Sequence, residues 1–357
     1  VSSAITYTGN ANSSLTLEAG RNLLLSASIT NKGPITLKAA GDVAVGATGV
    51  ALTTTAANAG ISLLSGDSLY DSPGGSTFYG VSLSTSGTGG HILLAADTDN
   101  SGAGAINFRG GFTANSRGGN ITLGGGNEQG TSYAVGINDN RYADGIRLDG
   151  VVSLLSGGGD IALRGKSWSG ASPSGYSAWG VGTWGAGTAK TFDAGSGKIL
   201  MDGISRDTGA GFRYGIELYG SRIDISSSNA TSDAIFLKGN STYAHGVNLN
   251  ATTATGIKIY ATGDGGGITI DGTGGSYATV FNNPTEILAK SGPINWLGNA
   301  GTTLYTNGLL TLGAKAGTPV TTSSSNVWVR GDEYEYAGGA GTWPIVNTSG
   351  SFTWQPA

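Results

Sequence analysis

The chain has 357 residues and contains no cysteine, one methionine and two histidines, and only 12% of its residues are charged. The absence of cysteine excludes a disulfide scaffold, a thiol nucleophile and a thiolate metal site. The 19 basic and 23 acidic residues give a net charge of −4 and form no basic stripe, so nucleic acid is a poor partner. No apolar run is long enough to cross a bilayer as a helix, and we expect no membrane insertion.

Glycine is abundant, with 65 residues, while 38% of the chain is still hydrophobic. Spaced isoleucine and leucine pairs argue against a disordered linker, which has no reason to keep them in register. The chain begins at Val1 with neither an initiator methionine nor a signal peptide, so we expect it to be a piece of a larger protein.

A repeat of three short alternating runs occupies the middle of the chain. Its opening glycines, at positions 145, 180, 215 and 246, are separated by 35, 35 and 31 residues. A period in this range is typical of a solenoid. Alternation of apolar and polar residues indicates strands, and glycine fits the bends between them. Three strands per unit predict one coil of a parallel β-helix. The opening runs are GIRLDG, GVGTWG, GIELYG and GVNLNA, and the closing runs are DIALRG, KILMDG, AIFLKG and GITIDG.

We therefore predict an all-β fold, a single solenoid of about ten coils with three short strands per coil and long loops along one edge. The shaft is expected to span residues 1–325, and residues 326–357 form a terminal coil, a cap or the start of another module. Two inward stacks follow from the register, one of Ile146, Ile216 and Val247 and the other of Ile161, Ile199, Ile235 and Ile268. An outward column with alternating charge is also expected, made by Arg164, Asp202, Lys238 and Asp271.

Residues surplus to a minimal coil fall mostly between the third strand of one unit and the first strand of the next. These segments, 166–179, 204–214, 240–245 and 273–279, should lie side by side on one edge of the stack. They are rich in aromatic residues, which either fold back as lids over the apolar wall or present exposed rings to a partner. The candidate ligand-binding residues are Trp168, Tyr176, Trp179, Phe212, Tyr214, Tyr243 and His245.

The segment 19–49 resembles the haemagglutinin-type repeats of two-partner-secretion exoproteins, the filamentous haemagglutinin-like family. The matching residues are the strand Ile35, Thr36 and Leu37, followed by Ala40, Gly41, Asp42 and Val43, which lead into another strand. The resemblance implies a right-handed parallel β-helix and a secreted or surface-displayed bacterial adhesin, of which this chain is a central part. It also implies an outer-membrane secretion partner for the parent protein and a host-cell glycan or protein as the ligand.

Two other functions stay open, because β-helices also carry enzymes and inert spacers. A polysaccharide-processing enzyme or tailspike-like depolymerase needs a pair of carboxylates at a defined spacing. The column that begins at Arg164 alternates in sign instead, and the two histidines, His91 and His245, lie far apart in the chain. We therefore expect no catalytic residues, no metal site and no cofactor, and we predict that the chain is not an enzyme.

A tripeptide near the end of the chain, Arg330-Gly331-Asp332, spells an integrin-recognition motif. The preceding residues from Val327 read as a strand that leads into a turn, so the tripeptide is either an exposed recognition loop or an ordinary charged turn.

Overall fold

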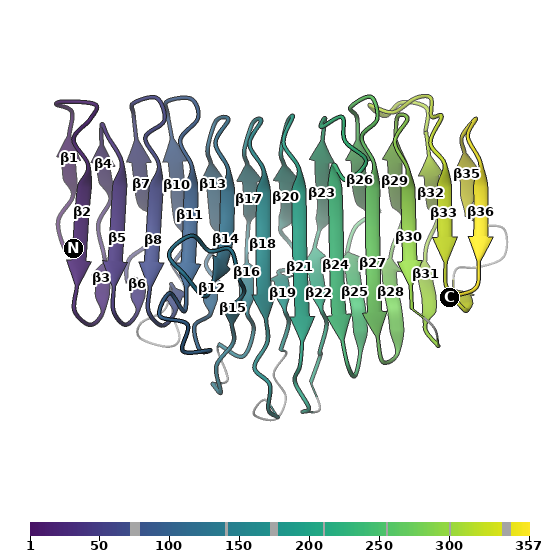
Figure 1. Cartoon of the computed structure of the whole chain (residues 1–357), viewed down its shortest axis with the longest axis horizontal. Coiled ribbons are helices and arrows are strands. Elements are labelled where there is room, and N and C mark those ends of the chain that lie inside the picture. Colours follow the sequence, from purple (N-terminus) through teal and green to yellow (C-terminus); the bar gives the residue numbers. More distant parts are fainter. Residues whose placement is uncertain are drawn as a thin grey trace.

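The fold is a right-handed parallel β-helix whose strands form three long parallel sheets (Figure 1). The computed structural model describes residues 1–71, 79–139, 142–171, 178–209, 211–254, 256–299, 301–337 and 344–357. Within these residues every regular element is a β-strand. The chain visits sheet A, sheet B and sheet C in turn, so each coil adds one strand to each sheet.

Sheet A contains β1 (Ile5–Tyr7), β4 (Ile29–Asn31), β7 (Val50–Thr54), β10 (Val81–Thr85), β13 (Phe112–Asn115), β17 (Val152–Leu155), β20 (Ala189–Asp193), β23 (Arg222–Ser227), β26 (Ile257–Ala261), β29 (Thr285–Ala289), β32 (Leu310–Gly313) and β35 (Ile345–Asn347). Sheet B contains β2 (Leu15–Ala19), β5 (Ile35–Ala39), β8 (Ile61–Ser65), β11 (Ile92–Ala96), β14 (Ile121–Gly125), β18 (Ile161–Lys166), β21 (Ile199–Ser205), β24 (Ile235–Ser241), β27 (Ile268–Gly274), β30 (Ile294–Gly298), β33 (Val327–Arg330) and β36 (Phe352–Gln355). The short β15 (Ala134–Val135) also pairs with β18. Sheet C contains β3 (Leu23–Leu25), β6 (Val43–Val45), β9 (Leu69–Tyr70), β12 (Ile106–Phe108), β16 (Ile146–Asp149), β19 (Val181–Trp184), β22 (Ile216–Gly220), β25 (His245–Ala251), β28 (Tyr277–Asn282), β31 (Thr303–Asn307) and β34 (Glu333–Tyr336).

The solenoid has about 12 coils rather than the ten expected from the repeat length. Coil length varies more than the central repeat indicated: partners Leu15 and Ile35 are 20 residues apart, while partners Ile121 and Ile161 are 40 apart. The residues from 326 onward also contribute four strands, β33 to β36, which extend all three sheets. A count based on the long central units therefore underestimates the number of coils.

Both predicted inward stacks are confirmed. In sheet C, Ile146 pairs with Val181, Val181 with Ile216, and Ile216 with Val247. In sheet B the register continues without a shift through the four isoleucines at 161, 199, 235 and 268. All of these side chains are buried, and they belong to one apolar core that runs the length of the solenoid. A coil cannot bury its apolar face alone, so this stacking supplies the stability.

One inward position in sheet A holds a lysine, and the alternating pattern is weak in the sequence at that point. Lys190 pairs with Val152 on one side and Ile223 on the other, and its side chain is fully buried. Its ammonium donates to the carbonyls of Gly150 and Trp184 and to the Thr188 hydroxyl, which fills its three donor positions at the corner between sheets C and A. Burial lowers the pKa of Lys190 to about 8.

The connections from sheet B to sheet C line one edge of the solenoid, the lower edge in Figure 1, as predicted. Two of the four expected segments are not long loops, however. β24 runs to Ser241 and β25 begins at His245, and only two residues separate β27 from β28. Strand pairing continues to the corner there, with Ser241 opposite Gly274 and His245 opposite Tyr277. The long connections of the edge therefore belong to the coils around β14, β18 and β21.

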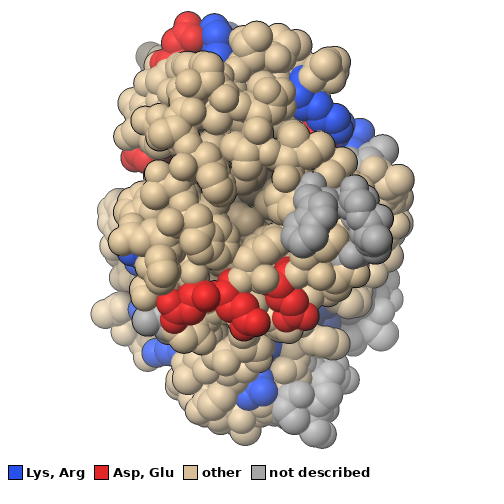
Figure 2. Space-filling view, turned by 90° about the vertical axis from the view of Figure 1, so that its right-hand side faces the viewer, with Lys and Arg blue, Asp and Glu red and all other residues tan. Residues whose placement is uncertain are grey.

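The C-terminal end of the solenoid exposes both apolar and acidic side chains. Figure 2 looks onto this end, where acidic side chains gather in a row. Asp332, Glu333 and Glu335 are exposed in and just before β34. In the last strands of the other two sheets, Ile345, Phe352 and Trp354 are 48%, 51% and 42% exposed.

In the described part of the chain, no helix has the length and apolar character needed to cross a bilayer.

Candidate functional site

A groove on the outer face of sheet C combines polar and aromatic side chains. It has a volume of about 210 Å³ and crosses the neighbouring strands β19, β22 and β25. The register brings its floor together, because Glu217 lies opposite Asn248 and Tyr219 opposite Asn250. The groove is lined by Trp179, Trp184, Phe212, Tyr214, Glu217, Tyr219, Asn248 and Asn250.

One side of the groove is an aromatic stack that depends on a glycine. Trp179 comes from the connection before β19, and its ring covers Gly182, where an added Cβ would lie 2.0 Å from the indole. The Trp179 amide donates to a carboxylate oxygen of Asp144 at 2.7 Å, which fixes the start of the strand. The rings of Trp179 and Trp184 stack with centroids 6.0 Å apart, and those of Trp184 and Tyr219 with centroids 4.3 Å apart.

The opposite side consists of Phe212 and Tyr214, from the connection before β22. Their ring centroids are 6.0 Å apart, and Tyr214 stacks on His245 of the next coil at 4.8 Å. Phe212 is 61% exposed and Trp184, across the groove, is 42% exposed, while Tyr214 is nearly buried. The groove thus presents two accessible rings that are held by buried ones. Such amphipathic surfaces are well suited to recognition at low entropic cost.

The floor is formed by a buried carboxyl and an amide. Asn248 donates its side-chain NH to a Glu217 carboxylate oxygen at 2.5 Å, and both residues are at most 5% exposed. Burial raises the pKa of the Glu217 carboxyl well above its usual range, although the hydrogen bond from Asn248 opposes the shift. The uncharged carboxyl is therefore favoured. Among the described residues, the Asn248 carbonyl oxygen and the Trp179 indole NH are buried without a hydrogen-bond partner.

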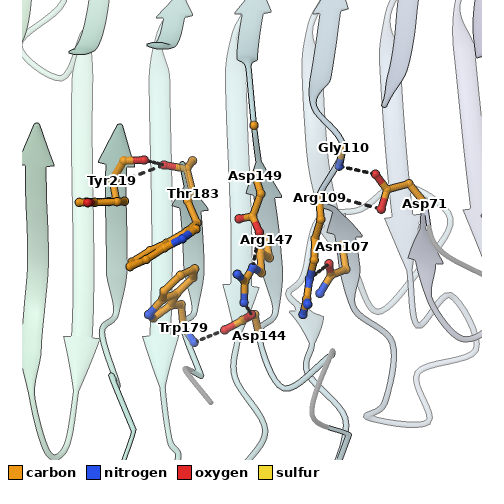
Figure 3. A network of polar contacts seen from close by, with 12 residues as sticks. Asp71, Asn107, Arg109, Gly110, Asp144, Arg147, Asp149, Trp179, Thr183 and Tyr219 are labelled. Atoms are coloured by element: carbon orange, nitrogen blue, oxygen red, sulfur yellow. Dashed lines mark hydrogen bonds and ion pairs between the residues drawn. The ribbon is translucent and has the colours of Figure 1, made fainter. Parts of the chain in front are cut away.

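An ionic network adjoins the groove on sheet C (Figure 3). Arg147 binds the carboxylates of Asp149 at 2.9 Å and Asp144 at 3.4 Å, and its guanidinium lies 4.9 Å from the centroid of the Trp179 ring. Burial raises the pKa of Asp144 to about 6 against the opposing effect of Arg147, and it raises that of Asp149 as well. Gly182 lies opposite Arg147 on one side and Glu217 on the other, so the Trp179 ring that covers Gly182 lies between the ionic network and Glu217.

On the preceding coils the network continues with Asp71, whose carboxylate accepts backbone NH groups of Arg109 at 3.0 Å and Gly110 at 2.6 Å. The Arg109 side chain donates to Asn107 at 3.0 Å. The Asp71 contacts connect the coil of β9 to that of β12, as Figure 3 shows, whereas the contact between Arg109 and Asn107 lies within one coil.

The predicted site residues separate into two groups. Trp179, Phe212 and Tyr214 line the groove, and His245 supports it from the next coil. Burial lowers the pKa of His245 to about 4, so its ring is neutral at physiological pH.

The remaining predicted aromatics lie elsewhere. Trp168 is half-buried and does not line the groove, and Tyr243 is 45% exposed, with the Arg213 guanidinium 4.9 Å from its ring centroid. Tyr176 lies outside the described residues.

The tripeptide Arg330-Gly331-Asp332 spans the end of β33 and the turn that follows, rather than a free loop. The Arg330 side chain donates to the Gly298 carbonyl at 3.3 Å and Gly331 is buried. Asp332 accepts the backbone NH groups of Gly301 and Ala357. Both charged side chains therefore have contacts within the chain, and the integrin-recognition hypothesis stays a prediction with no further support.

Five groove residues come from strands and are not among the candidates predicted from the sequence, which all lie in or beside the connections. They are Trp184, Glu217, Tyr219, Asn248 and Asn250. Their signal was present in the outward positions of GVGTWG, GIELYG and GVNLNA, where bulky or amide side chains recur on consecutive coils.

Within the described ranges, no three histidine, aspartate or glutamate side chains converge as a metal site. Comparisons of the chain with protein-family models, with curated proteins and with solved structures gave no match.

Proposed function

We propose that this chain is the shaft of a secreted or surface-displayed bacterial adhesin and that it binds a host-cell glycan through the groove on sheet C. The observation that carries the proposal is the pairing of accessible rings, Trp184 and Phe212, with a polar floor made by Glu217 and Asn248. Sugars have apolar faces of C–H bonds and rims of hydroxyl groups, and a groove with aromatic walls and a few placed polar groups complements both.

The shaft and its display follow from the resemblance to haemagglutinin-type repeats together with the elongated fold. A stack of 12 coils at about 4.8 Å per coil is tens of ångströms long, so a recognition surface on its side can lie that far from the end of the shaft. The parent protein would leave the cell through an outer-membrane partner, as the resemblance implies. A protein ligand is the alternative occupant of the groove.

Hydrolysis of a polysaccharide is the second candidate, because the groove region contains carboxyl groups with raised pKa values. Glycosidases hold two carboxyls about 5–5.5 Å apart for retention or about 6.5–9.5 Å apart for inversion. However, Asp149 is paired with Arg147, and the Trp179 ring lies over Gly182 of β19, between Asp149 on β16 and Glu217 on β22. This arrangement favours binding over bond cleavage.

The test is a glycan array together with a cell-adhesion assay on three proteins: the wild type, the double variant Trp184→Ala/Phe212→Ala and the control Trp328→Ala. Trp328 is 37% exposed on sheet B, away from the groove. We expect the double variant to bind at least tenfold more weakly and the control to be unchanged, with melting temperatures within about 3 °C of the wild type, because exposed side chains contribute little to stability.

Binding that survives in the double variant while its melting temperature falls would show that these rings are lids and would favour the spacer function. Release of reducing sugar ends from a bound glycan, lost in Glu217→Gln, would establish the enzyme instead.

A further inference from the structure

The groove offers no positive charge to a ligand. None of its eight lining residues is a lysine, an arginine or a histidine. The Arg147 guanidinium is paired with Asp144 and Asp149 on the far side of the Trp179 ring. His245, behind Tyr214, is held neutral by burial. A carboxylate or sulfate on a ligand would therefore lose its hydration without gaining a counter-charge, which is costly.

Two polar atoms on residues that line the groove lack a partner. The Asn248 side-chain oxygen is an acceptor and the Trp179 indole NH is a donor, and both are buried without a hydrogen bond among the described residues. A buried polar atom without a partner is costly, so a ligand that supplies the missing bonds gains affinity. A sugar hydroxyl can donate and accept at once, so hydroxyl groups can satisfy both atoms.

We propose that the groove selects uncharged sugars, whose hydroxyl groups bind Asn248 and the Trp179 indole NH while the ring faces pack on Trp184 and Phe212. This proposal rests on the proposed glycan-binding function and narrows it. Sialylated, uronate-containing and sulfated glycans are then excluded, because the groove has no cation to replace the hydration of their anionic groups.

The experiment measures binding of the whole chain to matched pairs of immobilised oligosaccharides, each pair consisting of an uncharged hexose oligomer and its uronate or sulfated counterpart. The wild type should bind the uncharged member of a pair at least tenfold more tightly. Asn248→Ala should weaken that binding about tenfold, and Trp179→Phe, which keeps a ring but removes the donor, should weaken it at least threefold. Asn307→Ala, an exposed asparagine on the same sheet outside the groove, is the matched control.

Tighter binding to charged members, still abolished by Trp184→Ala/Phe212→Ala, would overturn this inference and leave the glycan-binding function standing. Binding of uncharged oligomers that is unaffected by both Asn248→Ala and Trp179→Phe would also overturn it. Absence of binding to every pair, or binding indifferent to the double variant, would overturn the function and the inference together. Circular dichroism and melting curves show whether each variant is folded; should Asn248→Ala fail this check, Trp179→Phe carries the test.

Discussion

The first coils and the central coils share one apolar core but differ on the outer face of sheet C. In β3 the outward residue Leu24 is 47% exposed, whereas in β22 the outward residue Glu217 is only 2% exposed. Glu217 is buried together with side chains from the connections before β19 and β22, because Trp179, Phe212 and Tyr214 line the same groove. A minimal coil is thus a scaffold, and the added residues create an environment that a recognition site requires.

Replacing the buried carboxyl should produce the largest change in stability. For Glu217 the folded-state pKa is raised, so the folded state favours the protonated form, and the ionised form costs stability above the ordinary pKa of about 4.5. We expect Glu217→Gln to be more stable than the wild type at pH 7.5. The difference in the free energy of unfolding should grow by up to about 1.4 kcal/mol for each pH unit above the ordinary pKa of about 4.5, until the folded-state pKa is reached. Urea denaturation from pH 4 to pH 8 measures the difference.

Near pH 4 both proteins have an uncharged side chain at position 217, and their stabilities should converge. Glu18→Gln, at an exposed position of β2 on the first coils, is the control, because it makes the same substitution without burial. A Glu217→Gln variant that is less stable than the wild type at every pH would mean that the carboxylate is ionised and stabilising, contrary to the burial argument.

The glycine beneath Trp179 offers a sharper test of how the groove is built. A methyl group at position 182 would lie 2.0 Å from the indole, so Gly182→Ala must displace the ring and should cost about 1–3 kcal/mol. Gly187, in the turn of the same coil, has open space around its Cβ position and no positive φ, so Gly187→Ala is the matched control. The first variant should also lose glycan binding, and its tryptophan fluorescence should shift; equal behaviour of the two variants would show that the ring does not need this glycine.

Much of the scaffold could be predicted from the sequence because it depends on period-two alternation repeated from coil to coil. Such a pattern fixes which residues face inward, and both stacks of isoleucine and valine were placed correctly. The count of coils failed because the pattern gives no fixed coil length. Lys190 shows a further limit of prediction from the sequence, because a polar residue at an inward position weakens the alternating pattern. Its burial is explained only by the carbonyl groups at the corner, which accept hydrogen bonds from its ammonium.

The groove was only half predictable, since its two halves have different physical origins. Trp179, Phe212 and Tyr214 were found as aromatic residues in long connections, but nothing local states that one ring would cover Gly182 and be buried. Alternation places the strand residues Glu217 and Asn248 on the outward face, where side chains are ordinarily solvated. Their burial depends on connections from their own and neighbouring coils, which is a tertiary effect that alternation does not encode.

The charge column on sheet B should show the smallest effect of all. The predicted register is confirmed, because Arg164 pairs with Asp202, Asp202 with Lys238, and Lys238 with Asp271. Position in one column is not the same as ion pairing, however. Asp202 accepts a hydrogen bond of 2.7 Å from the Tyr133 hydroxyl, and Lys238 is exposed to solvent.

We therefore expect a double-mutant cycle of Lys238→Met and Asp271→Asn to give a coupling energy below about 0.5 kcal/mol, which salt removes because the charges are in contact with water. Asp202→Ala should cost about 0.5–1.5 kcal/mol, and the loss should persist in salt, because it removes the acceptor of the Tyr133 hydroxyl. Urea denaturation at 0.05 M and 1 M sodium chloride distinguishes the two cases. A coupling above about 1 kcal/mol between Lys238 and Asp271 would make the column a true ion-pair ladder, and sheet B would then contribute electrostatic stability that the burial pattern does not indicate.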